Sequence, residues 1–418
     1  MHVQGDTQMW GWLQDLFGGP TLEQVARKVM DALQQAGATS LTHDRGMNEV
    51  RGELNGSKFA LFLGNLYHEY KQAPRAQRAA VLDKYVGIQV QASNTPPDNY
   101  EQARAQLMPI VRTRADEAMG MLSLQRFAEP GEDLDDKRLA TRALVGDFVI
   151  GLAFDTPNAM QRINQHQLVG WAVSFDQALD DALQNLRALP EHGGWVRLGD
   201  SAWQGSWGDN YESSRILLPD LIHRLGVTEP VALMPLRYTL LVCSARDEKG
   251  LALLAERARE LMESEPRWLS LTPLKLGDKG WEVFTPPASC AKAYADLALL
   301  DESQSYAGQK SLLDDLNQRS GKDVFVASAT VVEKDGLLRS YSTWTEGVDT
   351  LLPRTELLVF IRLRDGQLDQ SLMLAWDVAA ELASHLMEAT DFSPPRYRVR
   401  GFPDAALWSR LQAAQVSL

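Results

Sequence analysis

The segment Asp209–Arg215 reads Asp-Asn-Tyr-Glu-Ser-Ser-Arg and places carboxylates, hydroxyls and a guanidinium close together, just before a leucine-rich stretch. A loop that enters a helix presents free backbone N–H groups, so Tyr211, Ser213 and Arg215 could bind a small anion there. The alternative is a helix cap, in which Asp209 or Ser213 accepts backbone N–H groups and Arg215 pairs with a carboxylate. Because helix starts commonly carry caps, we prefer the cap.

Two further polar residues, Asn185 and Arg187, lie near the end of a predicted helix over 175–189. Together with Asp209 and Arg215 they could form the site of an enzyme, for example a hydrolase, or of a small-anion-binding protein. The chain contains none of the motifs GxSxG, HExxH, GxxxxGK[ST] and GxGxxG. Enzymatic activity is therefore not favoured, and neither a metal nor a cofactor is expected.

Composition limits the classes of partner. The 418 residues carry 55 acidic and 42 basic side chains, a formal net charge of −13. Because an acidic chain repels phosphate backbones, nucleic-acid binding is not expected. Cys243 and Cys290 are the only cysteines, which excludes a disulfide framework and favours a cytoplasmic location. The longest apolar run, 143–154, is interrupted by Asp147 and is too short to span a membrane. The N-terminus lacks the pattern of a signal peptide.

Tryptophans in segments without helical or strand periodicity are candidates for contact with another protein. Trp195, Trp203 and Trp207 lie in a glycine-rich stretch, where they either pin a loop to the core or form a recognition surface. The first twenty residues hold a second group, which either packs on the body or contacts a partner. The candidate partner-binding residues are Trp10, Trp12, Phe17, Trp203 and Trp207.

The clearest elements lie just after the polar segment. A short apolar run with a β-branched residue, Tyr238–Val242, predicts a buried strand within the longer stretch Val231–Val242. An amphipathic helix is predicted over Glu248–Glu263, because its apolar residues recur at helical spacing. The predicted buried face consists of Leu251, Leu254, Ala255, Ala258, Leu261 and Met262.

A second stretch repeats this pattern. Pro353–Ile361 resembles Pro235–Cys243, and each is followed by a charged turn and apolar residues at the same helical spacing. We therefore predict an internal repeat in which 209–285 and 306–402 share strand order and connectivity. The predicted second helix would bury Leu372, Ala375, Trp376, Ala379, Leu382, Ala383 and Leu386.

The remaining pattern alternates helices and strands. In the N-terminal part, one helix is predicted over 21–36 and a second over 66–71, continued by 75–90. Two or three strands are predicted between them, over 40–44, 48–54 and 58–63. Farther on, a strand is predicted over 107–113 and an apolar run covers 144–155. Linkers are predicted over 93–99 and 285–289, and a last helix near 405–414.

Four short segments carry a family resemblance: Met108–Arg112, Asn185–Pro190, Asp209–Arg215 and His43–Arg45. In their order along the chain and in their surroundings, these segments are similar to the YtpQ-like family of uncharacterised bacterial proteins, over roughly residues 25–287. The family has Pro-Val-Ile-Arg, Phe-Asn-Val-Arg-Ser-Leu-Pro, Asp-Gly-Tyr-Asp-Ala-Ser-Arg and Tyr-Asp-Arg at these places. This chain departs from it at Asn210, Glu212 and Ser213, and only loosely matches a Thr-Ala-Glu-Thr run at Thr141-Arg142. The resemblance implies a mixed α/β intracellular protein and supplies no activity.

These patterns predict an α+β protein of tandem helix–strand–strand–helix units, with mainly antiparallel sheets backed by helices. The expected parts are an aromatic segment (1–20), an N-terminal α+β unit (21–92), a central YtpQ-like region (100–287) and a C-terminal repeat-like domain (290–418). The preferred function is a non-catalytic protein-interaction module, such as an adaptor, a chaperone-like factor or an immunity-type partner.

Overall fold

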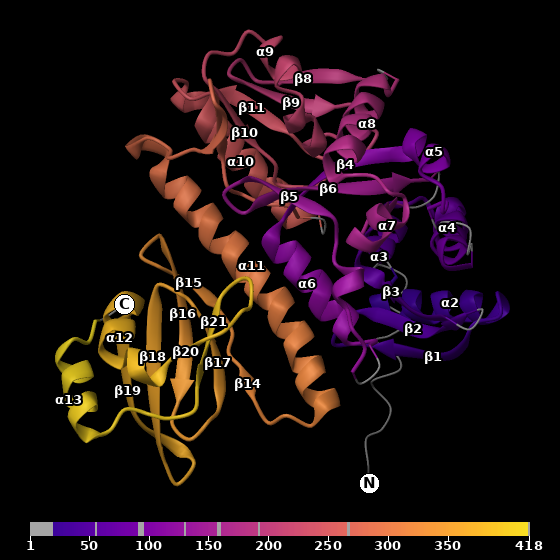
Figure 1. Cartoon of the computed structure of the whole chain (residues 1–418). Helices are drawn as coiled ribbons and strands as arrows, with labels where there is room; N and C mark the ends of the chain where they lie inside the picture. The colour runs from indigo at the N-terminus through magenta and orange to yellow at the C-terminus, as the bar shows by residue number, and fades with distance from the viewer. Residues whose placement is uncertain are drawn as a thin grey trace. The chain divides into compact units, whose positions relative to one another are not determined.

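The computed structural model describes residues 20–54, 57–90, 96–128, 131–156, 160–190, 193–265 and 268–416. The chain divides into two compact units. The first contains the chain up to Gln106 with Phe154–Gln161 and Ser264–Arg267, and the second contains Leu107–Ala153, Arg162–Glu263 and Trp268–Leu418. Figure 1 shows the elements of both units. Each is described by itself.

In the first unit, three helices pack on an antiparallel sheet of order β1-β2-β3. The first helix begins after Thr21, which forms a capping box with Gln24, and the chain turns at Gly37 with φ +96°. The first helix and the three strands predicted here are confirmed, whereas the second predicted helix is broken at Ala73 and Pro74, where the backbone is extended. The elements are α2 (Leu22–Gln35), β1 (Thr39–Asp44), β2 (Glu49–Leu54), β3 (Ser57–Phe62), α3 (Leu63–Gln72), η1 (Arg75–Gln77), α4 (Arg78–Val90), α5 (Tyr100–Ala103) and η3 (Arg104–Gln106).

The second unit begins with a sheet of order β4-β6-β5, with β7 paired to β6. The apolar run over 144–155 includes the turn of a hairpin, because the chain turns at Gly146, φ +56°, and Asp147. The helix after β4 is capped by Thr113, whose hydroxyl accepts from the Asp116 N–H. The elements are β4 (Leu107–Thr113), α6 (Arg114–Gln125), η4 (Asp135–Lys137), β5 (Thr141–Val145), β6 (Phe148–Asp155), β7 (Met160–Arg162), α7 (Gln165–Gly170) and α8 (Phe175–Ala188).

A six-stranded antiparallel sheet of order β13-β12-β10-β11-β9-β8 follows. The predicted helix over 248–263 is confirmed as α10, and its six predicted core residues are all buried. The strand predicted over 238–242 lies slightly later, as β11. The elements are β8 (Gly194–Leu198), β9 (Ala202–Ser206), η5 (Ser213–Leu217), α9 (Pro219–His223), β10 (Pro230–Leu233), β11 (Leu241–Ser244), α10 (Glu248–Ser264), β12 (Leu274–Gly277) and β13 (Gly280–Val283).

A helix of 33 residues, α11 (Ala288–Ser320), leads into two four-stranded sheets. It packs against α6 and against strands of these sheets, and Figure 1 shows it as the longest helix. The sheets have the orders β14-β17-β21-β20 and β15-β16-β18-β19. The elements are β14 (Phe325–Val326), β15 (Thr330–Lys334), β16 (Leu337–Thr345), β17 (Thr350–Pro353), β18 (Leu357–Arg364), β19 (Gln367–Ala375), α12 (Trp376–Ala383), η6 (Ser384–Leu386), β20 (Glu388–Ala389), β21 (Arg396–Val399) and α13 (Ala405–Ala413).

The predicted internal repeat is wrong. After β11 the chain forms the helix α10, whereas after β18 it turns back as the strand β19, antiparallel to β18. The parallel pairing of β18 with β16 also has no counterpart around β11, which pairs antiparallel on both sides. The expected second helix begins only at Trp376, because Leu372 and Leu374 point into the core from a strand.

The α+β class with mainly antiparallel sheets is confirmed. The pairs β14–β17 and β16–β18 are parallel. None of the helices in the part of the chain that the structure describes combines the length and the apolar character that a bilayer crossing requires.

One carboxylate of α11 predicts a pH dependence of stability. Asp301 Oδ2 accepts hydrogen bonds from Ser270 Oγ (3.2 Å) and the Leu271 N–H (3.0 Å), and burial raises the pKa of Asp301 to about 6. The unfolded chain loses this proton near pH ~4, so the folded state is progressively disfavoured as the pH rises from about 4 to 6. We therefore expect Asp301→Asn to melt above the wild type at pH 7, with a gap that closes below about pH 4.

Melting temperatures of wild type and variant across this pH range measure the effect. Asp323→Asn, which removes an exposed carboxylate beyond the end of the same helix, is the matched control and should show no such pH-dependent gap. A constant difference between Asp301→Asn and the wild type at every pH would contradict the prediction.

Candidate functional site

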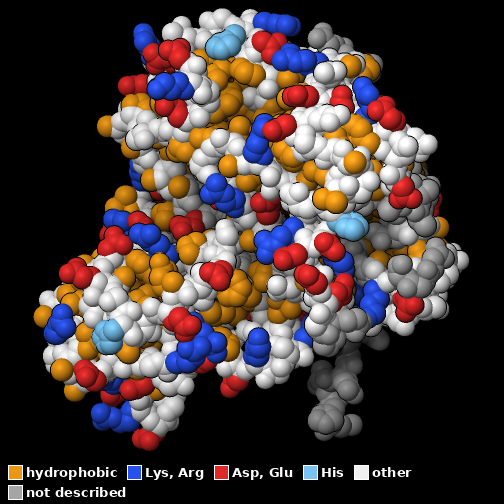
Figure 2. All heavy atoms as spheres, in the orientation of Figure 1, with side chains coloured by type: hydrophobic (Ala, Val, Ile, Leu, Met, Phe, Trp, Pro, Cys, Tyr) orange, Lys and Arg blue, Asp and Glu red, His pale blue; other side chains and the backbone are white. Residues whose placement is uncertain are grey.

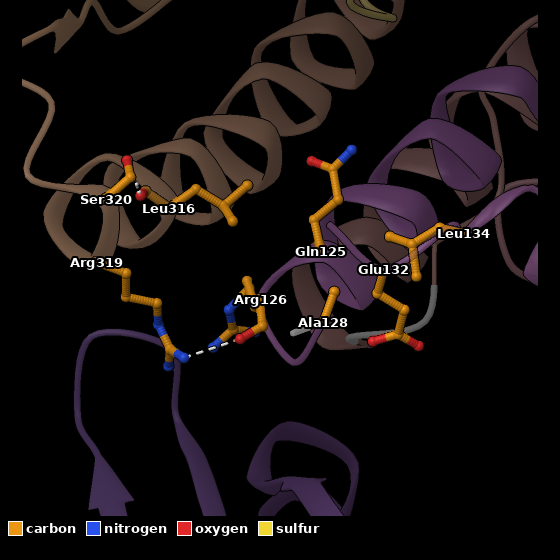
Figure 3. A pocket seen from close by; sticks show the side chains of 8 residues that line it. All are labelled: Gln125, Arg126, Ala128, Glu132, Leu134, Leu316, Arg319 and Ser320. Carbon is orange, nitrogen blue, oxygen red and sulfur yellow. Dashed lines mark hydrogen bonds between the residues drawn. The ribbon is translucent and has the colours of Figure 1, made fainter. Parts of the chain in front are cut away.

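Two hollows lie beside the packed helices α6 and α11. The first has a volume of about 640 Å³ and is lined from α6, the segment after it, and the last turns of α11 (Figure 3). Its lining residues are Gln125, Arg126, Ala128, Glu132, Leu134, Leu316, Arg319 and Ser320.

Buried ionic contacts hold the two helices beside this first hollow together. The Arg126 side chain is fully buried and donates from Nε to Asp315 Oδ2 at 2.6 Å. Arg319 Nε lies 2.9 Å from the same carboxylate oxygen, and Arg319 Nη1 donates to the Arg126 carbonyl at 2.9 Å, the bond dashed in Figure 3. The end of α6 is thereby tied to the end of α11.

The second hollow, of about 690 Å³, shares Gln125 with the first. Its apolar lining comes from α6, α11 and the sheet behind them: Ala118, Met121, Leu122, Leu313, Val324, Leu351 and Phe392. Charged residues of both signs line it as well: Arg138, Lys322, Glu388, Asp391 and Arg398. We call the two hollows together the α6–α11 groove. In Figure 2, apolar side chains and charges of both signs intermingle over the surface where these helices lie.

A second candidate site lies at the other end of α6, where three arginines surround Asp116. Arg237 Nη2 donates to Asp116 Oδ1 and Arg162 Nη1 donates to Oδ2, at 2.5 and 2.9 Å. Arg112 Nε lies 4.0 Å from Oδ2. Gly120, one turn along α6, leaves room for Arg162, because a Cβ there would come within 3.3 Å of the Arg162 Nη2. We call these four charged residues the arginine centre.

Burial and charge shift the pKa values of this centre. Burial acts to raise the pKa of Asp116, but the guanidinium groups of Arg237, Arg162 and Arg112 outweigh it and lower that pKa. Burial, together with the charge of Arg237, lowers the pKa of Arg112 to about 9. Burial also raises the pKa of the neighbouring Glu117. Asp116 is therefore a carboxylate at neutral pH, and it faces more positive charge than it can balance.

The predicted polar segment makes two of the contacts expected for a cap, but no side chain in the described part of the chain caps the start of η5. Asp209 Oδ1 accepts from the Tyr211 N–H at 3.0 Å, and both Asp209 oxygens accept from the Arg215 guanidinium. That guanidinium also lies 4.2 Å from the Trp207 ring centre. Ser213 Oγ donates to the Arg237 carbonyl, which joins this segment to the arginine centre. The expected anion position at Arg215 is thus occupied by the Asp209 carboxylate.

The other predicted residues are bonded elsewhere. Asn185 donates to the Leu107 carbonyl at 2.8 Å. Arg187 forms a two-pronged ion pair with Asp220. These contacts tie α8 to β4 and α9, and they do not lead toward Asp209 and Arg215.

The loop tryptophans differ from one another. Trp207 is 8% exposed and packs edge to face on Trp195, with ring centres 5.1 Å apart, so its prediction as an exposed recognition residue is wrong. The chain buries it because Arg215 and Trp195 cover its ring. Trp203 is partly exposed beside Arg197, at 4.5 Å from the ring centre. Trp10, Trp12 and Phe17 lie outside the described residues.

Sequence reasoning missed the arginine centre. Arg112 belongs to the Met108–Arg112 segment, Arg162 lies 50 residues farther on, and Arg237 lies in the strand-like segment Pro235–Cys243, 125 residues beyond Arg112. The one local signal was Asp116 in the first turn of a capped helix, a position that suits a carboxylate. Among the described residues, no three His, Cys, Asp or Glu side chains are grouped so as to hold a metal ion. Comparisons of the chain with protein-family models, with curated proteins and with solved structures give no significant match.

Proposed function

We propose that this chain is a non-catalytic protein-interaction module whose α6–α11 groove binds an extended segment of a partner protein. The observation that carries the proposal is the second hollow of that groove: about 690 Å³ of open space with an apolar lining from two packed helices. A hollow of this size accommodates a few side chains of a peptide.

The lining favours a peptide over a nucleic acid. Met121, Leu313 and Phe392 offer apolar contact, while Lys322 and Asp391 place opposite charges beside it. A nucleic acid would require clustered positive charge instead. The edge strand β20 also contributes to the lining and, within the described ranges of the chain, pairs with β21 alone. An exposed sheet edge can accept a further strand from a partner.

A charge placed in the groove tests the proposal. Met121 is half-buried in the lining, so Met121→Asp should lower affinity for the partner roughly tenfold or more, since an anchoring pocket would then hold an unpaired carboxylate. Val169→Asp, on an exposed position of α7 outside the groove, is the matched control.

The measurement has two stages. Proteins captured on the wild type, Met121→Asp and Val169→Asp are compared by quantitative mass spectrometry, and a protein lost only with Met121→Asp is then purified and titrated against all three. Equal affinity of that protein for Met121→Asp and wild type, with both melting alike, would refute the groove as its binding site.

The family resemblance and the location are part of the same proposal. The order of four short segments supports membership in the YtpQ-like family over roughly residues 25–287. A cytoplasmic location is supported by the two cysteines, both buried and both free thiols. Fractionation of cells that express the tagged chain checks the location.

A further inference from the structure

We propose that the arginine centre is a binding site for a small anion that carries a phosphate group. Three guanidinium groups share the single carboxylate of Asp116, and the charge of the neighbouring Glu117 acts on Arg162 from farther away. Two positive charges therefore remain without a carboxylate of their own at ion-pair distance. The inference concerns different residues from the groove and does not depend on the proposed function.

Other arginines of this unit are paired differently. Arg215 with Asp209, Arg187 with Asp220, and Arg398 with Asp349 each hold a carboxylate through both ends of the guanidinium. Asp220 and Asp349 each face one further arginine, Arg224 and Arg400. Asp315 is likewise shared by two, whereas Asp116 faces three. At Asp116 the arginines come from β4, β7 and the connection between β10 and β11, and they converge in excess.

The centre also contains buried donor atoms with nothing to donate to. Arg112 Nε and Arg237 Nε are buried and have no hydrogen-bond partner among the described residues. The Arg112 side chain as a whole is 9% exposed. Buried polar atoms in native proteins are nearly always hydrogen-bonded, and an unpaired guanidinium nitrogen costs free energy until a ligand or water supplies the acceptor.

Two of the three arginines are accessible to a ligand from solvent. The side chains of Arg162 and Arg237 are 33% and 40% exposed, whereas Arg112 lies beneath the surface. A phosphate group would accept hydrogen bonds from the two outer guanidinium groups and gain from the charge of the inner one. Arginine suits this because its planar fork matches phosphate oxygens, and a dianion balances the two surplus charges.

Asp116 then has two opposed effects. Its carboxylate holds Arg162 and Arg237 in place, and its negative charge repels an incoming anion. Asp116→Asn keeps the shape and an oxygen acceptor but removes that charge. We expect this substitution to lower the melting temperature without phosphate and to tighten phosphate binding at least roughly threefold.

The test uses the full-length chain and inorganic phosphate, titrated by calorimetry and by thermal shift against chloride at matched ionic strength. We expect saturable binding by the wild type, weakened roughly tenfold or more in Arg162→Gln and in Arg237→Gln, because each loses a charge-assisted hydrogen bond. Arg187→Gln, which removes an exposed paired arginine of the same unit, should leave the phosphate affinity unchanged.

Three results would overturn the inference: no saturable binding by the wild type, equal weakening in Arg187→Gln and Arg162→Gln, or weaker binding by Asp116→Asn than by the wild type. Arg162→Lys is a second variant that keeps the positive charge, in case Arg162→Gln does not fold. If Arg162→Lys binds phosphate far more tightly than Arg162→Gln, the positive charge at this position contributes to phosphate binding.

Discussion

Replacing Arg396 with Met should destabilise the second unit by about 3–5 kcal/mol. The side chain is fully buried and every one of its hydrogen-bond partners is a neutral oxygen. Nε donates to Gln309 Oε1, Nη1 to the Ala327 and Leu351 carbonyls, and Nη2 to the Tyr306 carbonyl. Methionine fills similar space but removes the guanidinium donors to these four oxygens in the core, of which the Leu351 carbonyl keeps its bond from the Ala327 N–H.

The cost of losing these partners exceeds the gain from removing a buried charge. Burial lowers the pKa of Arg396 to about 10, so the guanidinium remains charged at neutral pH. The Tyr306 ring, 5.2 Å from the guanidinium, contributes further attraction. Because α11, β17 and the segment before β15 all bond to this one side chain, its loss should loosen the attachment of α11 to the C-terminal sheets.

Denaturant unfolding of Arg396→Met and the wild type measures the difference. Arg398→Met, two residues along the same strand, removes a partly exposed arginine paired with Asp349 and should cost only about 0–1 kcal/mol. A similar loss of unfolding free energy in both variants would show that Arg396 stabilises the core no more than Arg398 does.

The second large effect is expected at the contact between α6 and α11. Arg126→Met should cost about 3 kcal/mol or more, since it leaves the Asp315 carboxylate, 14% exposed, without its buried counter-charge. Arg319, which is more exposed, would remain as a weaker partner on one side. The expected result is a lower melting temperature and a looser attachment of α6 to α11 beside the first hollow.

A double-mutant cycle separates the ion pair from the loss of packing. Arg126→Met combined with Asp315→Leu removes both charges, and it should be more stable than Arg126→Met alone, because no carboxylate is left without its buried counter-charge. If the double variant is instead less stable by the sum of the two single losses, the two side chains act independently.

The sequence alone determined the elements whose causes are local. The helices α2, α8 and α10 follow from apolar residues at helical spacing, and the caps Thr21 and Ser174 mark two of their starts. The strand β4 follows from a short apolar run. In each case a segment of fewer than about 20 residues determines its own secondary structure, because backbone hydrogen bonds within a helix and side-chain periodicity are local properties.

Where the pattern of a segment fits both a helix and a strand, the tertiary structure decided which of the two forms. Residues 367–375 were predicted to begin a helix, since apolar residues from Leu372 onward recur at helical spacing. Alternation also places Leu372 and Leu374 on one face of a strand, and the partner β18 supplies a full ladder of backbone hydrogen bonds. Pairing with a neighbour already in place outweighs a local helix preference.

The candidate sites depended on tertiary structure even more. Arg112, Arg162 and Arg237 are far apart along the chain, and no spacing in the sequence relates them to Asp116. Their meeting results from β4, β7 and the β10–β11 connection packing around the first turn of α6. The sequence predicted that Asp209 or Ser213 would accept backbone N–H groups and that Arg215 would pair with a carboxylate, and Asp209 supplies both contacts. Which arginines are satisfied and which are in excess is set by long-range packing, because charge balance depends on neighbours in space rather than along the chain.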